Sequence, residues 1–364
     1  MTLFVSGAFN KLINLVVHDL SDGLFAGSPA EGLEVYGCIF YNNGWAGPDR
    51  GHGHNVYLQN EKAAKVVADN VLFDSFSSGL QIYGTSAAYL RNFDIEGNTI
   101  FGSGDPVASR FGAAFDIEHW GGAPGGLGHA IYRHNSIYSR DARNLSVRLN
   151  APGEPAGEDI EFSDNIVHGQ THFNEMRRYI VTGNKFTSGA HPLLGQSVLI
   201  ALRMPPGVRY SSYTWDNNQY AVPALSTQDP FHIVDKSNNG YAFSSWQATT
   251  GYDRNSRFVQ GQFSGSDVVI RVNRYEPGRA FITCWNWSGA KGLNVDLSPV
   301  LKTGDRFEIR HVFGLFGAPL VSGVYTGRPI RIPQPVMSPP APLGFNQPAP
   351  MPDNRFNVFL LQKR

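Results

Sequence analysis

The sequence is short of cysteine, of charge and of long hydrophobic runs. Its 364 residues include two cysteines, Cys38 and Cys284, which excludes a disulfide framework and any zinc site built from several cysteines. Charged residues make up 16%, below the roughly 25% of an ordinary soluble protein, and 30 basic side chains balance 30 acidic ones. Because no block of Lys or Arg is present, neither nucleic acid nor an anionic membrane is expected as the main partner. No apolar run reaches the roughly 18 residues of a membrane span.

Turn-forming and aromatic residues, by contrast, are abundant. The chain contains 40 glycines, 23 prolines, 24 phenylalanines, 15 tyrosines and 6 tryptophans. Glycine and proline at this density would interrupt every helix of a helical bundle, whereas they suit short strands joined by turns. The composition therefore predicts an all-β protein.

An internal repeat runs through the first 190 residues. Just before a short apolar strand, an Asn or Gly recurs every 19–37 residues, at Asn14, Gly37, Asn70, Asn98, Asn135, Asn165 and Asn184. The position two residues after each marker is always apolar: Val16, Ile39, Leu72, Ile100, Ile137, Val167 and Phe186. Asn suits a sharp corner because it tolerates left-handed backbone and its amide can bond to the Asn of the next rung. The repeat thus predicts a coil of stacked rungs with parallel sheets, rather than a sandwich or propeller, whose hairpins would show Asn-Gly or Asp-Gly turns.

With this Asn-corner repeat over residues 10–190, the sequence resembles the right-handed parallel β-helix proteins of the pectin-lyase-like superfamily. Residues 51–60 and 79–84 are similar to rung strands of its bacterial members, and residues 244–256 to the segment that often closes such helices. The superfamily contains polysaccharide lyases, glycoside hydrolases, phage tailspikes and adhesins. The resemblance implies a polysaccharide or oligosaccharide partner and an extracellular or periplasmic native protein.

The N-terminus departs from this pattern. The chain begins almost inside a rung, without the capping helix that such coils usually carry, and residues 1–5 have no features of a signal peptide. We expect either a fragment of a longer protein, or that residues 1–10 or a partner chain cover this end. Self-association through the uncapped rung is an open alternative.

The character of the sequence changes after residue 257, where we expect the β-helix and its closing segment (1–257) to end. Short alternating strands with Gly and Pro turns predict a small antiparallel β-sandwich over residues 258–333. Residues 334–364 are expected to form a Pro-rich extended tail and a final strand. The sandwich is either a structural cap or, because of Trp285 and Trp287, a carbohydrate-binding module.

The second strand of each rung contains the candidate site. Aligning apolar residues gives two inward columns, Val56, Leu80, Phe115 and Leu145, and then Leu58, Ile82, Ile117 and Val147. Alternation directs outward Tyr57, Gln81, Asp116 and Ser146, and beside them Gln59, Tyr83, Glu118 and Arg148, flanked by His54 and His119. In related β-helix enzymes the sugar chain lies along a comparable face, and the resemblance implies the same here. The alternative is an ordinary solvated sheet face.

Asp116 and Glu118 are the candidate catalytic residues. Two residues apart on a strand, their Cα atoms are expected to lie roughly 6.5–7 Å apart, which fits a glycosidase and favours inversion over retention. Two acids this close repel, which tends to raise one pKa and supply a proton donor. Arg148, expected one rung away, can bind a uronate carboxylate or keep Glu118 ionised. The predicted substrate-binding residues are His52, His54, Tyr57, Gln59, Gln81, Tyr83, His119 and Arg148.

Residues 51–54, Gly-His-Gly-His, resemble the Gly-His-Gly motif of polygalacturonase-like hydrolases. The Asn-Thr-Asp, Asp-Asp and Arg-Ile-Lys motifs of those enzymes do not occur here in that form. The alternative interpretation of residues 51–54 is a glycine-rich loop whose histidines lie on the surface. The pairs His52/His54 and Asp116/Glu118 could bind a cation, but the sequence contains no EF-hand loop or His-Glu-x-x-His spacing. No cofactor is therefore expected, with calcium as an option if the protein is a lyase. A glycoside hydrolase is the leading prediction, followed by a uronate polysaccharide lyase and by a non-catalytic adhesion or assembly protein.

Overall fold

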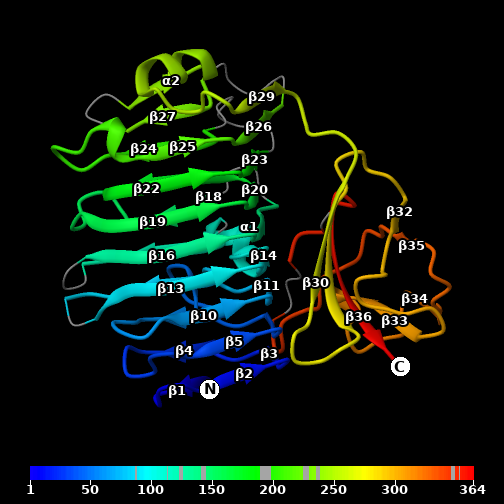
Figure 1. Ribbon diagram of the computed structural model, residues 1–364. Coiled ribbons are helices and arrows are strands. Elements are labelled where there is room, and N and C mark those ends of the chain that lie inside the picture. The colour runs from blue at the N-terminus through cyan, green and yellow to red at the C-terminus, as the bar shows by residue number, and fades with distance from the viewer. Residues whose placement is uncertain are drawn as a thin grey trace. The chain divides into compact units, whose positions relative to one another are not determined.

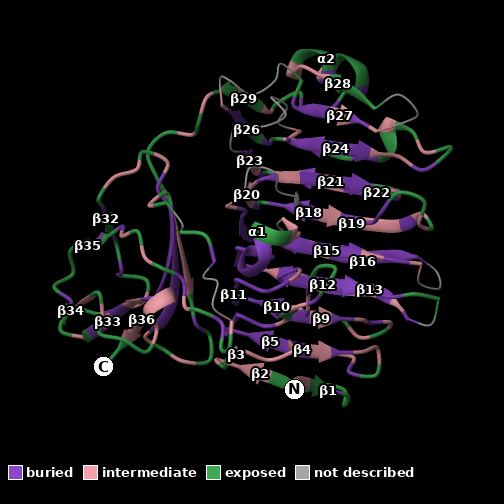
Figure 2. Cartoon of the chain, turned by 180° about the vertical axis from the view of Figure 1, so that it is seen from behind, coloured by how far each residue is buried: buried purple, intermediate pink, exposed green. Residues whose placement is uncertain are grey.

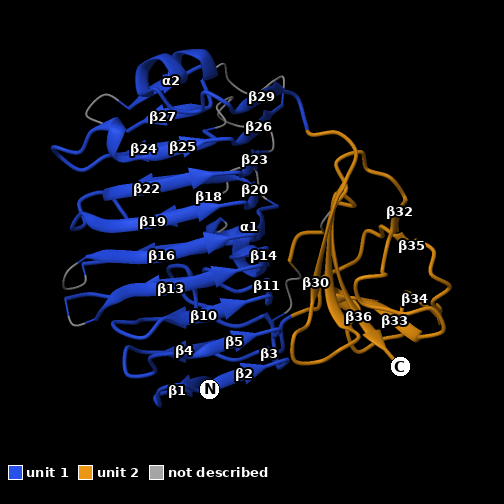
Figure 3. Ribbon diagram, in the orientation of Figure 1, with its two compact units in different colours: residues 1–262, 342–347 blue, residues 263–341, 348–364 orange. Residues whose placement is uncertain are grey.

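The computed structural model describes residues 1–86, 88–112, 114–122, 126–140, 145–188, 198–223, 229–234, 238–345, 349–351 and 353–364. The chain divides into two compact units (Figure 3). Unit 1 comprises residues 1–262 and 342–347, and unit 2 comprises residues 263–341 and 348–364. No helix among the described residues is long and apolar enough to cross a membrane.

Unit 1 is the predicted right-handed parallel β-helix, in which successive rungs stack into three sheets (Figure 1). Sheet A contains β1 (Thr2–Val5), β4 (Asp22–Ala26), β9 (Val56–Leu58), β12 (Leu80–Tyr83), β15 (Ile117–Trp120), β18 (Leu145–Leu149), β21 (Gln170–Asn174), β24 (Ile200–Arg203), β27 (Phe231–Ile233) and β28 (Asn239–Tyr241). Sheet B contains β2 (Lys11–Ile13), β5 (Glu34–Tyr36), β10 (Lys65–Ala68), β13 (Leu90–Glu96), β16 (Leu127–Arg133), β19 (Gly157–Ser163), β22 (Met176–Thr182) and β25 (Thr214–Asp216). Sheet C contains β3 (Val16–His18), β6 (Ile39–Tyr41), β11 (Val71–Phe73), β14 (Thr99–Phe101), β17 (Ser136–Tyr138), β20 (Ile166–His168), β23 (Lys185–Thr187), β26 (Gln219–Val222) and β29 (Arg257–Gln260).

Short elements interrupt the rungs of unit 1. They are the hairpin of β7 (Trp45–Ala46) and β8 (Gly51–His52), η1 (Asp105–Val107) with α1 (Ala108–Phe111), η2 (Tyr210–Ser212), and α2 (Phe243–Thr250). The predicted closing segment, residues 244–256, includes all of α2 except its first residue, and α2 lies at one end of the coil in Figure 1. The strands of the first rung, β1 to β3, are the outermost strands of the three sheets, and it is to these strands that the alternative of self-association refers. Buried apolar residues fill the interior of the coil. Figure 2 colours most of the strands of unit 1 as buried.

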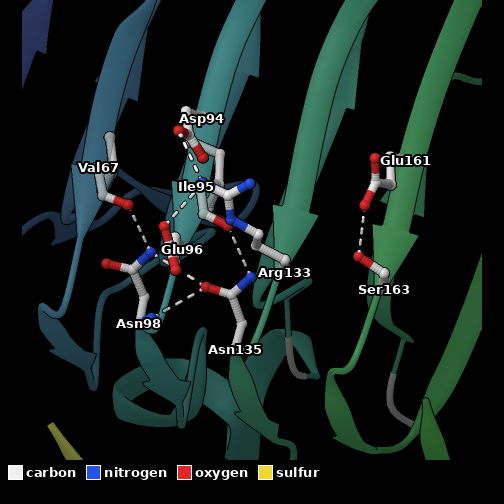
Figure 4. A network of polar contacts seen from close by, with 9 residues as sticks. All are labelled: Val67, Asp94, Ile95, Glu96, Asn98, Arg133, Asn135, Glu161 and Ser163. Atoms are coloured by element: carbon white, nitrogen blue, oxygen red, sulfur yellow. Dashed lines mark hydrogen bonds and ion pairs between the residues drawn. The ribbon is translucent and has the colours of Figure 1, made fainter. Parts of the chain in front are cut away.

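A ladder of buried asparagines holds the corner between sheets B and C, as the repeat predicted. Each amide nitrogen donates to the Oδ1 of the next Asn at 2.9–3.1 Å, and to a backbone carbonyl oxygen of the rung before it, through Asn70, Asn98, Asn135, Asn165, Asn184 and Asn218. Figure 4 shows the step from Asn98 to Asn135. The last amide donates to Asp253 Oδ1 at 3.2 Å. A carboxylate suits the end of this chain because it only accepts hydrogen bonds.

The left-handed residue at the corner is not the Asn, as we predicted, but the residue before it. It has φ between 52° and 73° at Asp69, Gly97, His134, Asp164, Gly183 and Asn217. In the first two rungs the markers Asn14 and Gly37 are themselves the left-handed residues, so the ladder position falls one residue later, on Leu15 and Cys38.

In the first two rungs the column of apolar residues is shifted by one residue in the same way as the ladder position. Val17 and Phe40 align with Leu72, so the predicted use of Val16 and Ile39 in this column is wrong. A slip of one residue reverses the face of a strand, which explains why Val16 is 38% exposed.

Unit 2 is built from antiparallel strands. A five-stranded sheet has the order β30 (Asp267–Val272), β31 (Arg279–Trp285), β36 (Phe356–Lys363), β33 (Arg306–His311) and β34 (Val321–Val324). A two-stranded sheet pairs β32 (Gly292–Val295) with β35 (Ile330–Pro333), and η3 (Val312–Gly314) follows β33. The final strand of the chain, β36, thus lies inside this sheet. Strand β34 was not predicted from the sequence. In unit 1, β29 extends sheet C beyond residue 257.

Candidate functional site

The outer face of sheet A brings one column of polar side chains together. Across β9, β12, β15 and β18, Tyr57 aligns with Gln81, Gln81 with Glu118, and Glu118 with Arg148. The predicted pairing of Glu118 with Arg148 is confirmed, whereas the predicted alignment of β12 with β15 is wrong by two residues. The loop that contains η1 and α1 ends at Asp116, so β15 starts only at Ile117. The alternation of inward and outward side chains therefore begins at Ile117. A shift of two residues preserves which side chains point outward, and Glu118 remains on the outer face.

This column forms the floor of a pocket of about 530 Å³ within unit 1. Of the ten predicted site residues, seven line it: His52, His54, Tyr57, Gln81, Tyr83, Glu118 and Arg148. The other lining residues are Arg50, Gly51, Gly53, Phe76, Ser77, Ser78, Val107, Phe111, Gly112, Ala114, Phe115 and Trp120. Among all of these described residues, Glu118 is the one carboxylate.

Glu118 lies at the bottom of this pocket and is 8% exposed. Its Oε1 accepts a hydrogen bond from the Arg148 guanidinium, and its Oε2 accepts one from the Ser78 hydroxyl at 2.5 Å. Burial raises the pKa of Glu118, against the opposing effects of Arg148 and Ser78, which favour the ionised form. Glu118 is therefore a carboxyl group whose proton affinity is higher than usual and whose orientation is held from two sides.

Aromatic rings surround the guanidinium of Arg148. Its central carbon lies 4.5 Å from the ring centroid of Phe115 and 4.5 Å from that of Trp120. Trp120 in turn contacts Tyr83, with ring centroids 4.6 Å apart. The two rings hold the guanidinium of Arg148 in place at the pocket through cation–π contacts.

Two histidines enter the pocket from the β7–β8 hairpin and the bend that follows it. His54 Nδ1 lies 3.3 Å from the Ser78 carbonyl oxygen, an acceptor, so Nδ1 carries the proton and Nε2 keeps its lone pair. Burial lowers the pKa of His54 to about 4, so its imidazole is neutral near pH 7. Ser78 thus contacts both His54 and Glu118. His52 Nε2 instead bonds to Asp49 Oδ1 at 2.8 Å, and its ring stacks on Trp45.

The glycines of the Gly-His-Gly sequence have a steric explanation. A Cβ atom on Gly51 would lie 1.8 Å from the Phe76 carbonyl oxygen, and one on Gly53 would lie 2.0 Å from the Ser21 carbonyl oxygen. Gly53 also has φ +85°, which L side chains rarely adopt. These glycines let the hairpin approach the neighbouring rungs closely and so bring His52 and His54 to the pocket.

Gln81 presents a buried acceptor at the pocket. The side chain is 5% exposed, and its Oε1 has no hydrogen-bond partner among the described residues. A buried polar atom without a partner destabilises the free protein, and a hydroxyl group of a bound ligand would satisfy it if the amide turned toward the pocket.

Three predicted site residues lie elsewhere. Asp116 is 1% exposed and accepts a hydrogen bond from the Ser103 backbone at 3.3 Å, so its predicted place on the open face is wrong. His119 points inward, where it bonds to the Tyr132 hydroxyl at 2.8 Å and lies 3.1 Å from the Leu90 carbonyl oxygen. His119 lies two residues after Ile117, which points inward, so the alternation along the strand already places His119 on the inner face. Gln59 donates to the Tyr83 carbonyl oxygen and does not line the pocket.

The assigned columns change accordingly. Phe115, predicted to point inward, lines the pocket, and Ser146, predicted to point outward, is fully buried and donates to the His168 carbonyl oxygen. The side chain of Leu145 lies outside the described residues. Sequence reasoning missed Ser78 and Trp120 as pocket residues. Trp120 could have been predicted from the sequence, because it lies two residues after Glu118 on the same strand and so points to the same outer face.

A second cluster of charges lies beneath the loop that forms one wall of the pocket. Arg140 pairs with Asp74, and its Nε lies 2.6 Å from Asp105 Oδ2. All three side chains are at most 6% exposed. Burial raises the pKa of Asp74 to about 7 and raises that of Asp116 strongly. The cluster anchors the start of the loop that carries Phe111 and Phe115 into the pocket.

Two features outside the pocket bear on earlier predictions. Trp285 is fully buried in unit 2, and Trp287 stacks on it with its Nε1 bonded to Asp267 Oδ2 at 2.8 Å. Among the residues that the structure describes, one group could hold a metal ion: His129, Glu158 and Asp159 on β16 and β19 of sheet B. Its side chains are half exposed and already paired with one another at 2.8–2.9 Å.

Comparison with known proteins gives a sparse result. No family model matches the chain, and no curated protein matches it. Among solved structures, the chain is similar to a tailspike protein mutant of Escherichia coli bacteriophage HK620 in complex with a hexasaccharide. The TM-score is 0.30 at 10% identity, over 100% of this chain and 66% of that one, slightly under two thirds of its length. It is also similar to the Dettilon tailspike protein, with a TM-score of 0.22, 9% identity, and coverage of 100% and 86%. The assignment of the β-helix rests on the strand pairing of unit 1.

Proposed function

We propose that the protein binds a polysaccharide in the pocket of sheet A and hydrolyses one of its glycosidic bonds, with Glu118 as the acid/base residue. The observation that supports this most is a single buried carboxyl group on the floor of a pocket that also presents six Phe, Tyr and Trp residues, with the carboxyl group held by Arg148 and Ser78. Aromatic rings suit the apolar faces of sugars, and the unpartnered Gln81 oxygen suits a sugar hydroxyl.

The acid/base chemistry draws on two groups joined through Ser78. A raised pKa lets Glu118 carry a proton at a higher pH than an ordinary carboxyl group does, so that it can protonate the leaving oxygen of a glycosidic bond. Neutral His54, with its free Nε2, can accept a proton from the attacking water. This assignment replaces the predicted pair of Asp116 and Glu118, because Asp116 does not line the pocket.

The test is a screen of a polysaccharide panel for new reducing ends, with the wild-type chain and Glu118→Gln side by side. The proposal predicts turnover of at least one polymer by the wild type, and binding of that polymer without turnover by the variant. Binding without turnover by both proteins would support the non-catalytic alternative. Full turnover by Glu118→Gln would overturn the assignment.

A uronate lyase is the second candidate, favoured by the two guanidinium groups of Arg50 and Arg148 at a pocket with one carboxylate. Arginine binds carboxylates, as β-elimination next to a uronate requires. An unsaturated product, detected by its ultraviolet absorbance in the same screen, would select this candidate over hydrolysis.

A further inference from the structure

A file of aromatic rings runs from the pocket toward the first rung of the β-helix. Phe4 aligns with Phe25, Phe25 with Tyr57, and Tyr57 with Gln81, so the three rings continue the outward column that contains Glu118. The Phe4 and Phe25 rings stack with centroids 5.5 Å apart, and Phe25 meets Tyr57 edge-on at 5.0 Å. We call Phe4, Phe25 and Tyr57 the aromatic track.

The track is accessible along its length. Phe4 is 62% exposed, whereas Phe25 and Tyr57 are half-buried. Neighbouring strands lie about 4.8 Å apart, so two further rungs extend the binding surface by about 10 Å beyond Tyr57. Exposed apolar groups that lie together in this way mark a binding surface more often than isolated ones do.

The column is different on the other side of the pocket. Beyond Arg148 it continues through His172, Ala201 and His232, without a phenyl or phenol ring. The nine positions therefore divide into three aromatic residues, the three polar residues of the pocket floor, and a histidine-containing end. This asymmetry gives the surface a direction.

We propose that the aromatic track is a set of additional binding positions for the sugar units of the same polysaccharide on the first-rung side of Glu118, so that cleavage occurs near one end of the bound segment. The inference rests on the proposed function. A single file of rings, one per rung and continuous with the pocket, fits an extended chain, whereas a stable protein partner needs about 800 Å² on each side. Because the rings contact one another, each offers a sugar the apolar surface that its neighbour leaves uncovered, and Phe4 offers the most.

The experiment measures polymer binding in the uncleaving Glu118→Gln background. Native gels that each contain polygalacturonate, alginate, hyaluronate, xylan, dextran or a bacterial O-polysaccharide give an affinity from the retardation of the protein. Adding Phe25→Ala or Phe4→Ala should weaken binding of the retarding polymer by ~3- to 10-fold. Phe9→Ala is the matched control, because Phe9 is 69% exposed in the bend between β1 and β2, outside the track, and it should leave the retardation unchanged.

The outcomes separate this inference from the function on which it rests. If Glu118→Gln is retarded and both track variants are retarded equally, the track is refuted while the pocket stands. Equal weakening by Phe9→Ala also refutes it. If no polymer retards Glu118→Gln, both proposals fail. Phe4→Ala removes an exposed ring, so it remains informative if Phe25→Ala lowers the thermal unfolding temperature.

Discussion

Two arginine–carboxylate clusters lie close together in unit 1, and they differ in access to solvent. In the pocket, one carboxyl group, Glu118, meets one arginine, Arg148, whose side chain is 23% exposed. Beneath the adjacent loop, Arg140 is 6% exposed and meets Asp74 and Asp105, with Asp116 close to them. The open cluster of Glu118 and Arg148 can exchange protons and form hydrogen bonds with a ligand. The sealed cluster around Arg140 has almost no exposed surface, so it can only hold the loop in place. Charge and residue type alone therefore do not distinguish a reactive site from a structural one.

The sharpest contrast is between the two acids that the sequence placed together. Replacing Glu118 by Gln should lower turnover by roughly 10²–10⁴-fold, because it removes the acid/base group. Replacing Asp116 by Asn should change turnover only a few-fold, because a neutral amide keeps the oxygen that accepts from the Ser103 backbone. Steady-state rates on the polymer found in the screen measure both. A loss of turnover in Asp116→Asn at an unchanged unfolding temperature would restore Asp116 as a catalytic residue.

The two arginines should differ most in stability. Arg140→Met leaves buried carboxylates without their counter-charge and should lower the free energy of unfolding by about 3–5 kcal/mol. Arg148→Met should cost only about 1 kcal/mol, because its ion pair is partly solvated and the rings that pack against it remain. Urea unfolding of both variants beside the wild type tests this. Equal losses would show that the pocket cluster is as structural as the sealed one.

The pH dependence of stability should reveal the sealed cluster. Burial raises the pKa of Asp74 to about 7, so the folded protein binds a proton that the unfolded chain releases near pH 4. The free energy of unfolding should therefore fall as pH rises from about 4 to 7, by on the order of 2–4 kcal/mol for this group. Asp74→Asn should remove that fall.

The control for this experiment is Asp49→Asn. His52 holds the pKa of the exposed Asp49 below its usual value, so its small contribution has the opposite sign and appears as pH rises. Urea midpoints at pH 4.5, 6 and 7.5 compare the three proteins. A fall of the same size in Asp74→Asn and wild type would show that Asp74 does not retain its proton in the folded state.

The difference between the clusters also explains what the sequence could predict. The rungs and the Asn ladder follow from a repeated corner, and the pairing of Glu118 with Arg148 follows from alternation on two strands. The loop that contains η1 and α1 has no such period, so the start of β15 and the burial of Asp116 at the end of that loop were not predictable. Ser78 was not predictable for the same reason, because it lies in the irregular segment between β11 and β12 and acts through one hydroxyl group.

The smallest expected effect concerns that hydroxyl group. Ser78→Ala removes the 2.5 Å hydrogen bond to Glu118 Oε2, which favours the ionised carboxylate, so the pKa of Glu118 should rise further. If Glu118 donates the proton in catalysis, the alkaline decline of turnover should move to higher pH, with a stability change of about 1 kcal/mol. Ser77→Ala is the matched control, since Ser77 also lines the pocket, and its profile should be unchanged. An alkaline limb that stays in place in Ser78→Ala would mean that a group other than Glu118 controls it.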